Sequence, residues 1–446
     1  MIVIDSNEVM LVSKHKRFPF IKPNMKNISF LDEVDSEEED VREVIVETKS
    51  GFNTLEVLVI VIISIIFGIA VGSSLSIFRQ EYRGEKVSNS LQELITVYQD
   101  ILDTYYKDID EADLVDAAVD GMLSSLDDPY STYMDEDSAT TFNETVDGSY
   151  VGIGVTIHIK DTGEVTVIGV TKNSPADEAN IKEGDIILSL DGKSVSGLSL
   201  EEISSIVKGD SNSKLKMVLE RDNEEITKTV TRGTVDMVSV TSDVFRMEQS
   251  KVGYISISSF AANTYKQFKK ELKTVEKKNI NSLVLDVRSN PGGHLSQTRD
   301  ILELFLKKNR VLYQVEFKGK VTKIKDKTKT SRNYPIVVLI NSSSASAAEI
   351  LASAFQDSYP NAILLGEKTY GKGTIQTAYS LSDGSTLKYT TDKWLTPKGK
   401  SIDGKGVSPD EVVLLTTEYF KNPTIENDLQ LQTALSILEK KTTNSD

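Results

Sequence analysis

The sequence predicts an α/β protein of several domains, and three observations support this prediction. The chain has 446 residues, more than usually surround one hydrophobic core. Short apolar runs at 282–287, 336–340 and 362–365 are typical of buried parallel strands, and amphipathic helical stretches separate them. Residues 149–234 instead alternate apolar and polar residues between turn signals, as a small β-rich domain does. We therefore expect a β-rich domain joined to an α/β domain.

The composition excludes several classes of function. The formal net charge is −16, which argues against nucleic acid as a partner. The chain has no cysteine, so disulfides and thiolate metal sites are excluded. Its three histidines, His15, His158 and His294, leave little material for a histidine metal centre or a Ser-His-Asp triad. We expect no metal and no cofactor.

The N-terminal region predicts a tail followed by a membrane anchor. Residues 1–54 are polar with an acidic run at 35–40, so we expect a mostly disordered tail. Residues 57–78 carry no charge and are long enough for the roughly 30 Å of a bilayer core, which predicts a transmembrane helix over 55–78. A cleaved signal peptide and a buried core helix are the alternatives. The long acidic leader and the lack of an A-x-A site favour the anchor.

Residues 88–147 predict a helical region. Leu91, Leu94, Ile95 and Tyr98 begin an apolar face that continues at helical spacing. An acidic cluster follows in this region, and its spacing lacks the glycine and glutamate of a calcium loop. The members of this cluster are Asp127, Asp128, Asp135 and Asp137. We interpret them as turn and capping residues rather than metal ligands.

Residues 148–234 contain the pieces of a peptide-binding domain. They include a Gly-Ile-Gly loop at 152–154, a Ser-Pro-Ala turn at 174–176, a hairpin sequence at 184–192 and a helix at 199–207. In this order they resemble a PDZ domain. The resemblance implies that a peptide C-terminus adds as a strand and that loop N–H groups near Gly152, Ile153 and Gly154 bind its carboxylate. A PDZ fold without a ligand role is the alternative.

Residues 235–420 predict the α/β domain, and its first turn is glycine-rich. The strand at 282–287 ends in Arg-Ser-Asn-Pro-Gly-Gly, where glycines leave backbone N–H groups unobstructed. His294 directly follows and could lie near a nucleophile. A helix N-terminus disfavours a protonated histidine there, and no motif positions it.

The stretch 335–376 predicts a strand, a sharp turn, a helix, a second strand and a lysine between two glycines. Ser346 would lie where the N-terminal N–H groups of the helix stabilise an oxyanion. Lys372 could take the proton of the serine only if burial lowers its pKa. Gln376 is placed to hold the lysine by a hydrogen bond. Spacing alone leaves open a capping serine and a surface lysine.

The motifs N-x-x-S-A-S-A-x-E-I-L-A and G-E-x-T-x-G-K-G-x-I-Q resemble those of the carboxyl-terminal processing peptidases, or tail-specific proteases. The resemblance implies Ser346 as nucleophile, Lys372 as general base and Gln376 as the residue that positions the lysine. It makes the amides of Gly292 and Ala347 the oxyanion hole. Ser342, Ser343 and Ser344 do not match the motif position.

The resemblance covers about 88–440 and implies a crotonase/ClpP-like α/β peptidase core beside the PDZ domain. It also places the tail in the cytoplasm and the catalytic part outside it. Residues 421–446 predict a closing helix, and this helix or the N-terminal helices could pair two subunits in a homodimer. The basic stretch 318–332 lacks the aromatic pattern of a nucleic-acid site, so we expect a solvated hairpin.

We therefore expect a single-pass cell-membrane serine endopeptidase that recognises protein substrates by accessible C-terminal tails. Two other classes remain open. One is a membrane-tethered PDZ protein with an inactive peptidase core. The other is an acyl-CoA enzyme, because crotonase-like cores carry both chemistries, although a PDZ domain and an anchor count against it.

Overall fold

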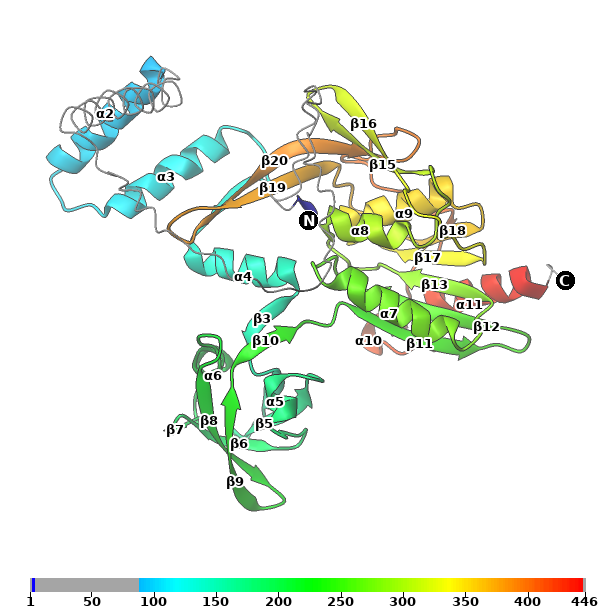
Figure 1. Ribbon diagram of the computed structural model, residues 1–446, viewed down its shortest axis with the longest axis horizontal. Coiled ribbons are helices and arrows are strands. Elements are labelled where there is room, and N and C mark those ends of the chain that lie inside the picture. The colour runs from blue at the N-terminus through cyan, green and yellow to red at the C-terminus, as the bar shows by residue number, and fades with distance from the viewer. Residues whose placement is uncertain (1, 5–87, 444–446) are drawn as a thin grey trace, which may run out of the picture. The chain divides into compact units, whose positions relative to one another are not determined.

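The computed structural model describes residues 2–4 and 88–443. Residues 2–4 and 118–443 belong to one compact unit, and the described residues 88–117 belong to another (Figure 1). The predicted membrane span at 55–78 lies outside the described residues. Within the described residues, no helix combines the length and the apolar character needed to cross a membrane.

The helical prediction for the region after residue 88 is confirmed. Helix α2 (Asn89–Thr104) starts at Ser88, whose hydroxyl accepts a hydrogen bond from the Leu91 N–H at 3.2 Å. Four of its apolar side chains, Leu91, Leu94, Ile95 and Val97, are exposed. Helices α3 (Glu111–Ser124) and α4 (Glu136–Asp147) follow, with strand β2 (Thr132–Met134) between them. Asp135 caps α4, as a capping role predicts.

The β-rich domain is an antiparallel sheet in the order β4-β5-β6-β8-β9. Ile203 of α6 packs into the same core cluster as Val155 and Ile157 of β4, so helix and edge strand lie together. The other edge of β4 has no partner strand among the described residues and can accept a further strand. The elements are β4 (Val155–Ile159), β5 (Val165–Val170), α5 (Pro175–Glu178), β6 (Ile186–Leu190), β7 (Lys193–Ser194), α6 (Leu200–Val207), β8 (Lys214–Arg221) and β9 (Glu224–Thr231).

A two-stranded ribbon carries the chain into and out of this domain. Strand β3 (Ser149–Gly152) pairs antiparallel with β10 (Gly233–Asp236), and Met237 N–H donates to the Gly148 carbonyl at 2.7 Å. The Asn263 side-chain amide also donates to the Gly148 carbonyl, at 2.7 Å. The ribbon therefore ends on the α/β domain.

The α/β domain contains a six-stranded sheet in the order β11-β12-β13-β17-β18-β21. Only β11 runs antiparallel to its neighbour, and each apolar run predicted as a parallel strand forms one. The strands are β11 (Val240–Arg246), β12 (Lys251–Ile257), β13 (Ser282–Asp286), β17 (Ile336–Ile340), β18 (Ala362–Gly366) and β21 (Glu411–Val412).

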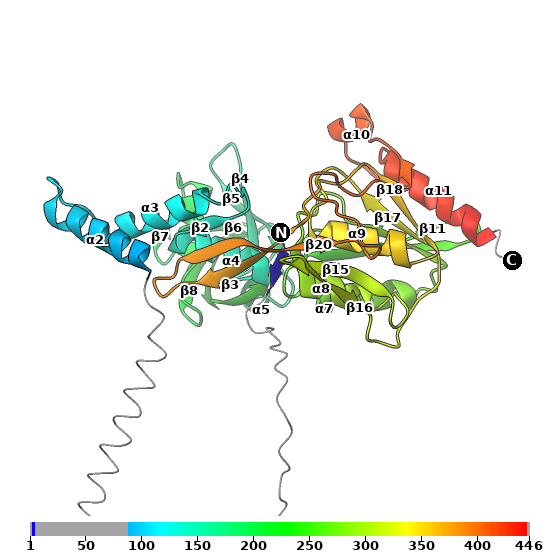
Figure 2. The ribbon, with the colours of Figure 1, turned by 90° about the horizontal axis from the view of Figure 1, so that it is seen from above.

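Helices cover both faces of this sheet, which is why its strands are apolar throughout. Alternate residues such as Leu283 and Val338 pack under α7 (Thr264–Glu276), α8 (Leu295–Leu302) and α9 (Ala347–Ser358). The residues that alternate with these, such as Val284 and Val337, face the other side of the sheet and pack under α11 (Leu429–Thr443). Helix α11 follows the short α10 (Thr417–Lys421). Figure 2 shows α11 on the side of the sheet opposite α7 and α8.

A second sheet of seven strands lies beside the first in the order β14-β1-β19-β20-β15-β16, with β2 on β20. Strand β1, formed by residues 2–4, runs parallel between β14 and β19, and Val3 pairs with both His294 and Gln376. The other strands are β14 (Gly293–His294), β15 (Val311–Phe317), β16 (Lys320–Lys325), β19 (Thr374–Ser380) and β20 (Thr386–Leu395). The space between β14 and β19 therefore accepts an extended chain.

Candidate active site

Ser346 is the one serine in its turn whose hydroxyl is both buried and unpartnered. The Ser344 hydroxyl donates to the Val287 carbonyl at 2.7 Å, which anchors the turn to the neighbouring strand. Ser342 and Ser343 are exposed. Ser346 is fully buried, and its Oγ has no hydrogen-bond partner among the described residues. A buried hydroxyl without a partner is unfavourable and is often a mark of function.

The backbone holds Ser346 in an uncommon conformation at the start of α9. Its φ is 58° and its ψ is −114°, a region that non-glycine residues seldom adopt. Every residue from Ala347 to Phe355 is buried, so packing of α9 offsets the strain. The N–H of Ala347 has no acceptor among the described residues. It lies at the positive end of the helix, where an oxyanion is stabilised.

Glu349 joins the segment of Ser346 to the segment of Lys372. Its carboxylate is fully buried, and its Oε2 accepts from the N–H of Ser346 at 2.7 Å and of Lys372 at 2.9 Å. Its Oε1 accepts from the Thr369 hydroxyl at 2.6 Å and the Gly371 N–H at 2.7 Å. No role was predicted for Glu349. The Ser-x-x-Glu pattern of a capping box could have identified it.

Glycines on both sides of Lys372 are required by close backbone approach. Gly371 has a φ of +96°, and a Cβ there would meet the Gly406 nitrogen at 2.8 Å. A Cβ at Gly373 would meet the Cβ of Asp403 at 2.5 Å. The prediction that these glycines allow close packing around the lysine is confirmed. The indole Nε1 of the buried Trp394 donates to the Lys372 carbonyl at 2.8 Å and fixes the strand from the other side.

The Lys372 side chain is buried, with 7% of the residue exposed, and its Nζ lies 4.3 Å from the centre of the Tyr130 ring. Burial lowers the pKa of Lys372 to about 8, and the Lys388 cation acts in the same direction. Asp128 and Glu349 act in the opposite direction. A larger fraction of Lys372 is therefore neutral near pH 7 than of an ordinary lysine, as a general base requires.

Gln376 is fully buried on β19, but it does not bind Lys372 in this structure. Its Nε2 donates to the hydroxyls of Thr374 at 2.9 Å and Thr390 at 3.0 Å. Its Oε1 is buried without a partner. No hydrogen bond between described residues joins Ser346 Oγ, Lys372 Nζ and Gln376. The three unpaired groups would have to approach one another for catalysis.

The glycine turn lies beside the turn that contains Ser346, as its backbone contacts show. Ala345 N–H donates to the Asn290 carbonyl at 2.9 Å, and the Asn290 amide donates to the Ile257 carbonyl at 2.8 Å. Gly292 is our predicted oxyanion donor. Its N–H donates to Asn290 Oδ1 at 2.8 Å in this structure. Gly292 has to release this acceptor before it can serve an oxyanion.

A buried network of charged side chains holds the start of the glycine turn. Arg288 donates to Asp286 through Nη2 at 2.6 Å and to Asp428 of the C-terminal segment at 2.8 Å. Its Nη1 also donates to Gln430 at 3.0 Å, and the Tyr254 hydroxyl donates to Asp286 at 2.8 Å. Buried charges are stable only with such complete pairing. This network has no sequence signature, because its members are far apart in the chain.

His294 has a structural partner. Its ring nitrogen Nε2 lies 3.1 Å from the Val146 carbonyl oxygen at the end of α4.

In the acidic cluster, Asp128 accepts hydrogen bonds from the Ser131 hydroxyl at 2.5 Å and from the Tyr130 N–H at 3.1 Å. No group of three or more potential ligands that could hold a metal ion occurs in the part of the chain that the structure describes.

The Gly-Ile-Gly loop lies at the entrance to edge strand β4. Gly154 has a φ of +82°, and a Cβ there would meet the Ser174 Cβ at 2.4 Å, so only glycine fits. The Ile153 carbonyl accepts from Ala176 N–H at 2.8 Å, which fixes the loop to α5. The N–H groups of Ile153 and Gly154 have no acceptor among the described residues. They are available for a carboxylate.

Comparison with known proteins gives three matches to family models. Residues 251–413 match peptidase family S41, residues 166–221 match a PDZ domain, and residues 70–138 match the N-terminal domain of the activating protease CtpB. The chain is 38% identical over 369 residues to the carboxy-terminal processing protease CtpA of Bacillus subtilis (strain 168). The match covers 80% of this chain and 78% of that protein.

Two further relatives extend the comparison. The carboxy-terminal processing protease CtpB of the same Bacillus subtilis strain is 34% identical over 351 residues, which cover 78% of this chain and 72% of the relative. The solved structure of a photosystem II D1 C-terminal processing protease is 27% identical with a TM-score of 0.44. That match covers 73% of this chain and 87% of the other.

Proposed function

The chain belongs to peptidase family S41 as a carboxy-terminal processing serine protease with a PDZ domain, and from this premise we propose that Ser346 and Lys372 are its catalytic dyad. The observation that supports this most directly is the shared carboxylate of Glu349. One buried oxygen accepts from the backbone of both residues, so the motifs that contain them meet in space. The lowered pKa of Lys372 supports its role as base.

The proposed reaction is peptide-bond hydrolysis through an acyl-enzyme. Ser346 Oγ attacks the carbonyl carbon and transfers its proton to Lys372 Nζ. The N–H groups of Ala347 and Gly292 bind the oxyanion, and Lys372 returns the proton to the departing amine. Water then attacks the ester, and Lys372 again takes and returns the proton. Gln376 offers its Oε1 to hold the lysine amine during these steps.

A serine-reactive fluorophosphonate probe tests the nucleophile and separates an active from an inactive core. We expect labelling of the full chain, loss of labelling in Ser346→Ala, and full labelling in Ser343→Ala, which changes an exposed serine of the same turn. Unlabelled wild-type protein, or a labelled Ser346→Ala variant, would contradict the dyad and favour a PDZ binding protein with an inactive core.

We further propose that the PDZ domain selects substrates by their C-termini. The unpaired edge of β4 and the free amides of Ile153 and Gly154 support strand addition and carboxylate binding. Peptides with a free carboxylate should be cleaved faster than the same peptides with an amidated C-terminus. Equal rates would remove the carboxylate from the mechanism.

Two proposals concern the assembly. Residues 55–78 are proposed to anchor the chain once in the cell membrane, with residues 1–54 in the cytoplasm and the catalytic part outside. The exposed apolar residues of α2 support pairing with a second subunit. Protease digestion of intact cells tests the first, because degradation of the catalytic part from outside is expected. Sedimentation of the full chain tests the second.

A further inference from the structure

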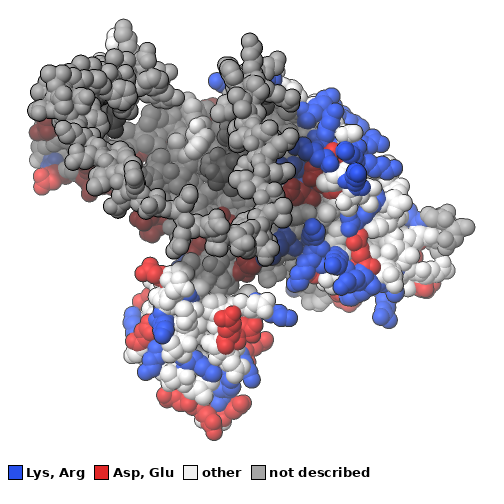
Figure 3. All heavy atoms as spheres, viewed as in Figure 1, with Lys and Arg blue, Asp and Glu red and all other residues white. Residues whose placement is uncertain are grey.

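The α/β domain carries a basic surface on a chain that is acidic as a whole. Residues 264–278 contain six lysines and two glutamates, and residues 307–332 contain ten lysines and arginines against two acids. These two segments, which we call the basic surface, therefore carry +4 and +8, whereas the whole chain carries −16. All of their lysines are exposed. Figure 3 shows their positive side chains gathered over α7 and the β15–β16 hairpin.

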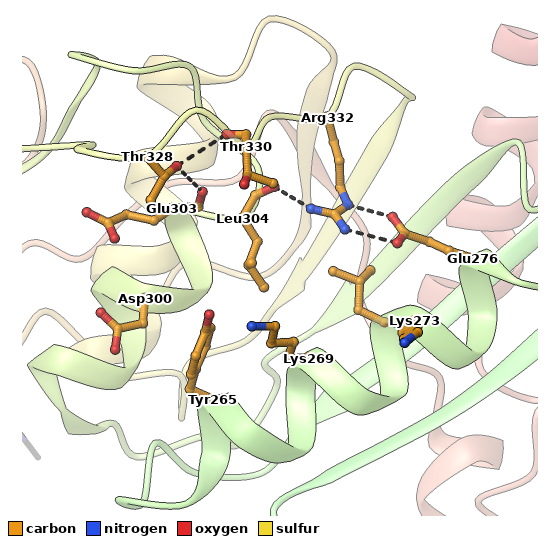
Figure 4. Close-up of a pocket in the computed structure, with 11 residues that line it drawn as sticks. Tyr265, Lys269, Lys273, Glu276, Asp300, Glu303, Leu304, Thr328, Thr330 and Arg332 are labelled. Carbon is orange, nitrogen blue, oxygen red and sulfur yellow. Dashed lines mark hydrogen bonds and ion pairs between the residues drawn. The ribbon is translucent and has the colours of Figure 1, made fainter.

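The two segments form one continuous surface. A cavity of about 390 Å³ lies between them, and both contribute to its lining. Figure 4 shows Tyr265, Lys269 and Glu276 of α7 facing Thr328 and Arg332 across this cavity. Arg332 Nε donates to Glu276 at 2.5 Å and ties the segments together.

Three of the four acids in the two segments, Glu271, Glu276 and Asp326, are engaged by the protein itself. Glu276 accepts from Arg332, and Asp326 is buried and accepts from the Thr328 N–H at 2.6 Å. Glu271 accepts from the Ser242 hydroxyl at 2.6 Å. Asp300 and Glu303 also line the cavity, where Asp300 pairs with Arg299 at 3.0 Å and Glu303 accepts from the Lys327 N–H at 3.3 Å. The exposed lysines therefore dominate the field that a partner meets.

The hairpin tip adds apolar side chains to this charge. Lys318 and Gly319 form a two-residue turn with positive φ at both positions. Phe317 is 51% exposed and Val321 46% exposed, and the strand register places them on opposite faces of the tip. Lysines 318, 320, 323 and 325 flank them. A polyanion in solution would use the lysines but gives no reason for two exposed apolar residues at the tip.

We propose that the basic surface docks on an anionic lipid bilayer, with the β15–β16 tip entering the headgroup region. Phe317 and Val321 would reach the acyl boundary, and the lysines would lie at the level of the lipid phosphates. This inference rests only on residues 264–278 and 307–332 and does not depend on the catalytic residues or the anchor.

A second hairpin provides a matched control. Strands β8 and β9 are joined by Asp222 and Asn223, which also have positive φ at both positions. Glu225 pairs with Glu220 there as Val321 pairs with Glu316 in the basic hairpin. The two tips share their turn geometry but have opposite charge.

The test uses the absence of cysteine in the chain. Full-length Val321→Cys and Glu225→Cys are labelled with a polarity-sensitive dye and placed in nanodiscs of phosphatidylcholine, with or without an equal part of phosphatidylglycerol. The label at 321 should shift to the blue and be quenched by brominated acyl chains only in the anionic discs. Both effects should vanish at high salt and in a variant that also carries Lys318→Glu, Lys320→Glu and Lys323→Glu.

Three results would overturn the proposal. They are a label at 321 that behaves like the label at 225, quenching that is equal in neutral and anionic discs, and a blue shift that soluble polyphosphate or DNA produces without lipid. Each variant is first shown to have the circular dichroism spectrum and the thermal unfolding midpoint of the wild-type chain, so that a lost signal is not a lost fold.

Discussion

The serine side and the lysine side of the active site are held in different ways. Ser346 is fixed by its own backbone, by the buried helix α9 and by the carboxylate of Glu349. Lys372 has a fixed backbone, but its side chain depends on Tyr130, Asp128 and Lys388, which come from two distant parts of the chain. The proposed nucleophile is therefore positioned locally, whereas the pKa of the proposed base is tuned by tertiary contacts.

The largest expected effect tests whether the base is needed at all. Lys372→Ala should lower kcat/KM by roughly 10⁴-fold, as removal of a member of a catalytic unit does. Lys372→Arg should lose as much, because a guanidinium does not give up its proton near neutral pH. His294→Ala should retain most activity, and the reverse pattern would reassign the base to the histidine.

A change at Glu349 should affect both sides at once. Glu349→Gln replaces one acceptor oxygen with an amide that faces N–H donors, so we expect a loss of about 2–4 kcal/mol in unfolding free energy. We also expect roughly a hundred-fold fall in kcat, because both backbones shift. Asp357→Asn on the same helix is the control, since its Lys398 partner is exposed. Denaturation and kinetics that match this control would show that Glu349 does not join the sides.

The buried ion pairs of Arg288 next to the glycine turn should contribute to the free energy of unfolding. Arg288→Gln leaves Asp286 and Asp428 buried without their cation, which should cost about 3–5 kcal/mol. Urea denaturation measures this loss, and Arg299→Gln is the control because its ion pair with Asp300 is more exposed. Equal losses in the two variants would remove the buried network as a special support of the serine side.

The smallest expected effect is a shift in the midpoint of the pH profile of kcat/KM. Substitutions of two charged neighbours of Lys372 should move this midpoint in opposite directions. The proposed base acts as the neutral amine, so kcat/KM should rise with pH towards a plateau above about 8. Lys388→Gln removes a like charge, so the midpoint should move to higher pH. Asp128→Asn removes an opposite charge, so it should move to lower pH. Shifts of the same sign would show that charge at these positions does not tune the base.

The difference between the two sides also explains what the sequence could predict. The strands, helices and glycines around Ser346 and Lys372 follow from local patterns, and the structure contains them. Exact helix ends do not follow from such patterns: α8 ends at Leu302 although the buried apolar residues continue to Leu306, because Leu304 N–H and Phe305 N–H donate three residues back, to Ile301 and Leu302.

Contacts between distant segments could not be predicted. Asp128 is predicted to be a turn or capping residue, and only the folded chain brings it and Tyr130 to Lys372. The hydrogen bond that Gly292 gives to Asn290 depends on a side-chain rotamer that no sequence pattern specifies.

The backbone at Ser346 restricts which side chains could replace the proposed nucleophile. With a φ of 58°, the position tolerates serine, and it would tolerate cysteine, but a β-branched residue is a severe outlier there. Threonine offers the same hydroxyl chemistry, yet its extra methyl would force the turn open. An evolutionary exchange between serine and threonine, which is a small change in the codon, is therefore closed to this enzyme unless the turn itself is rebuilt.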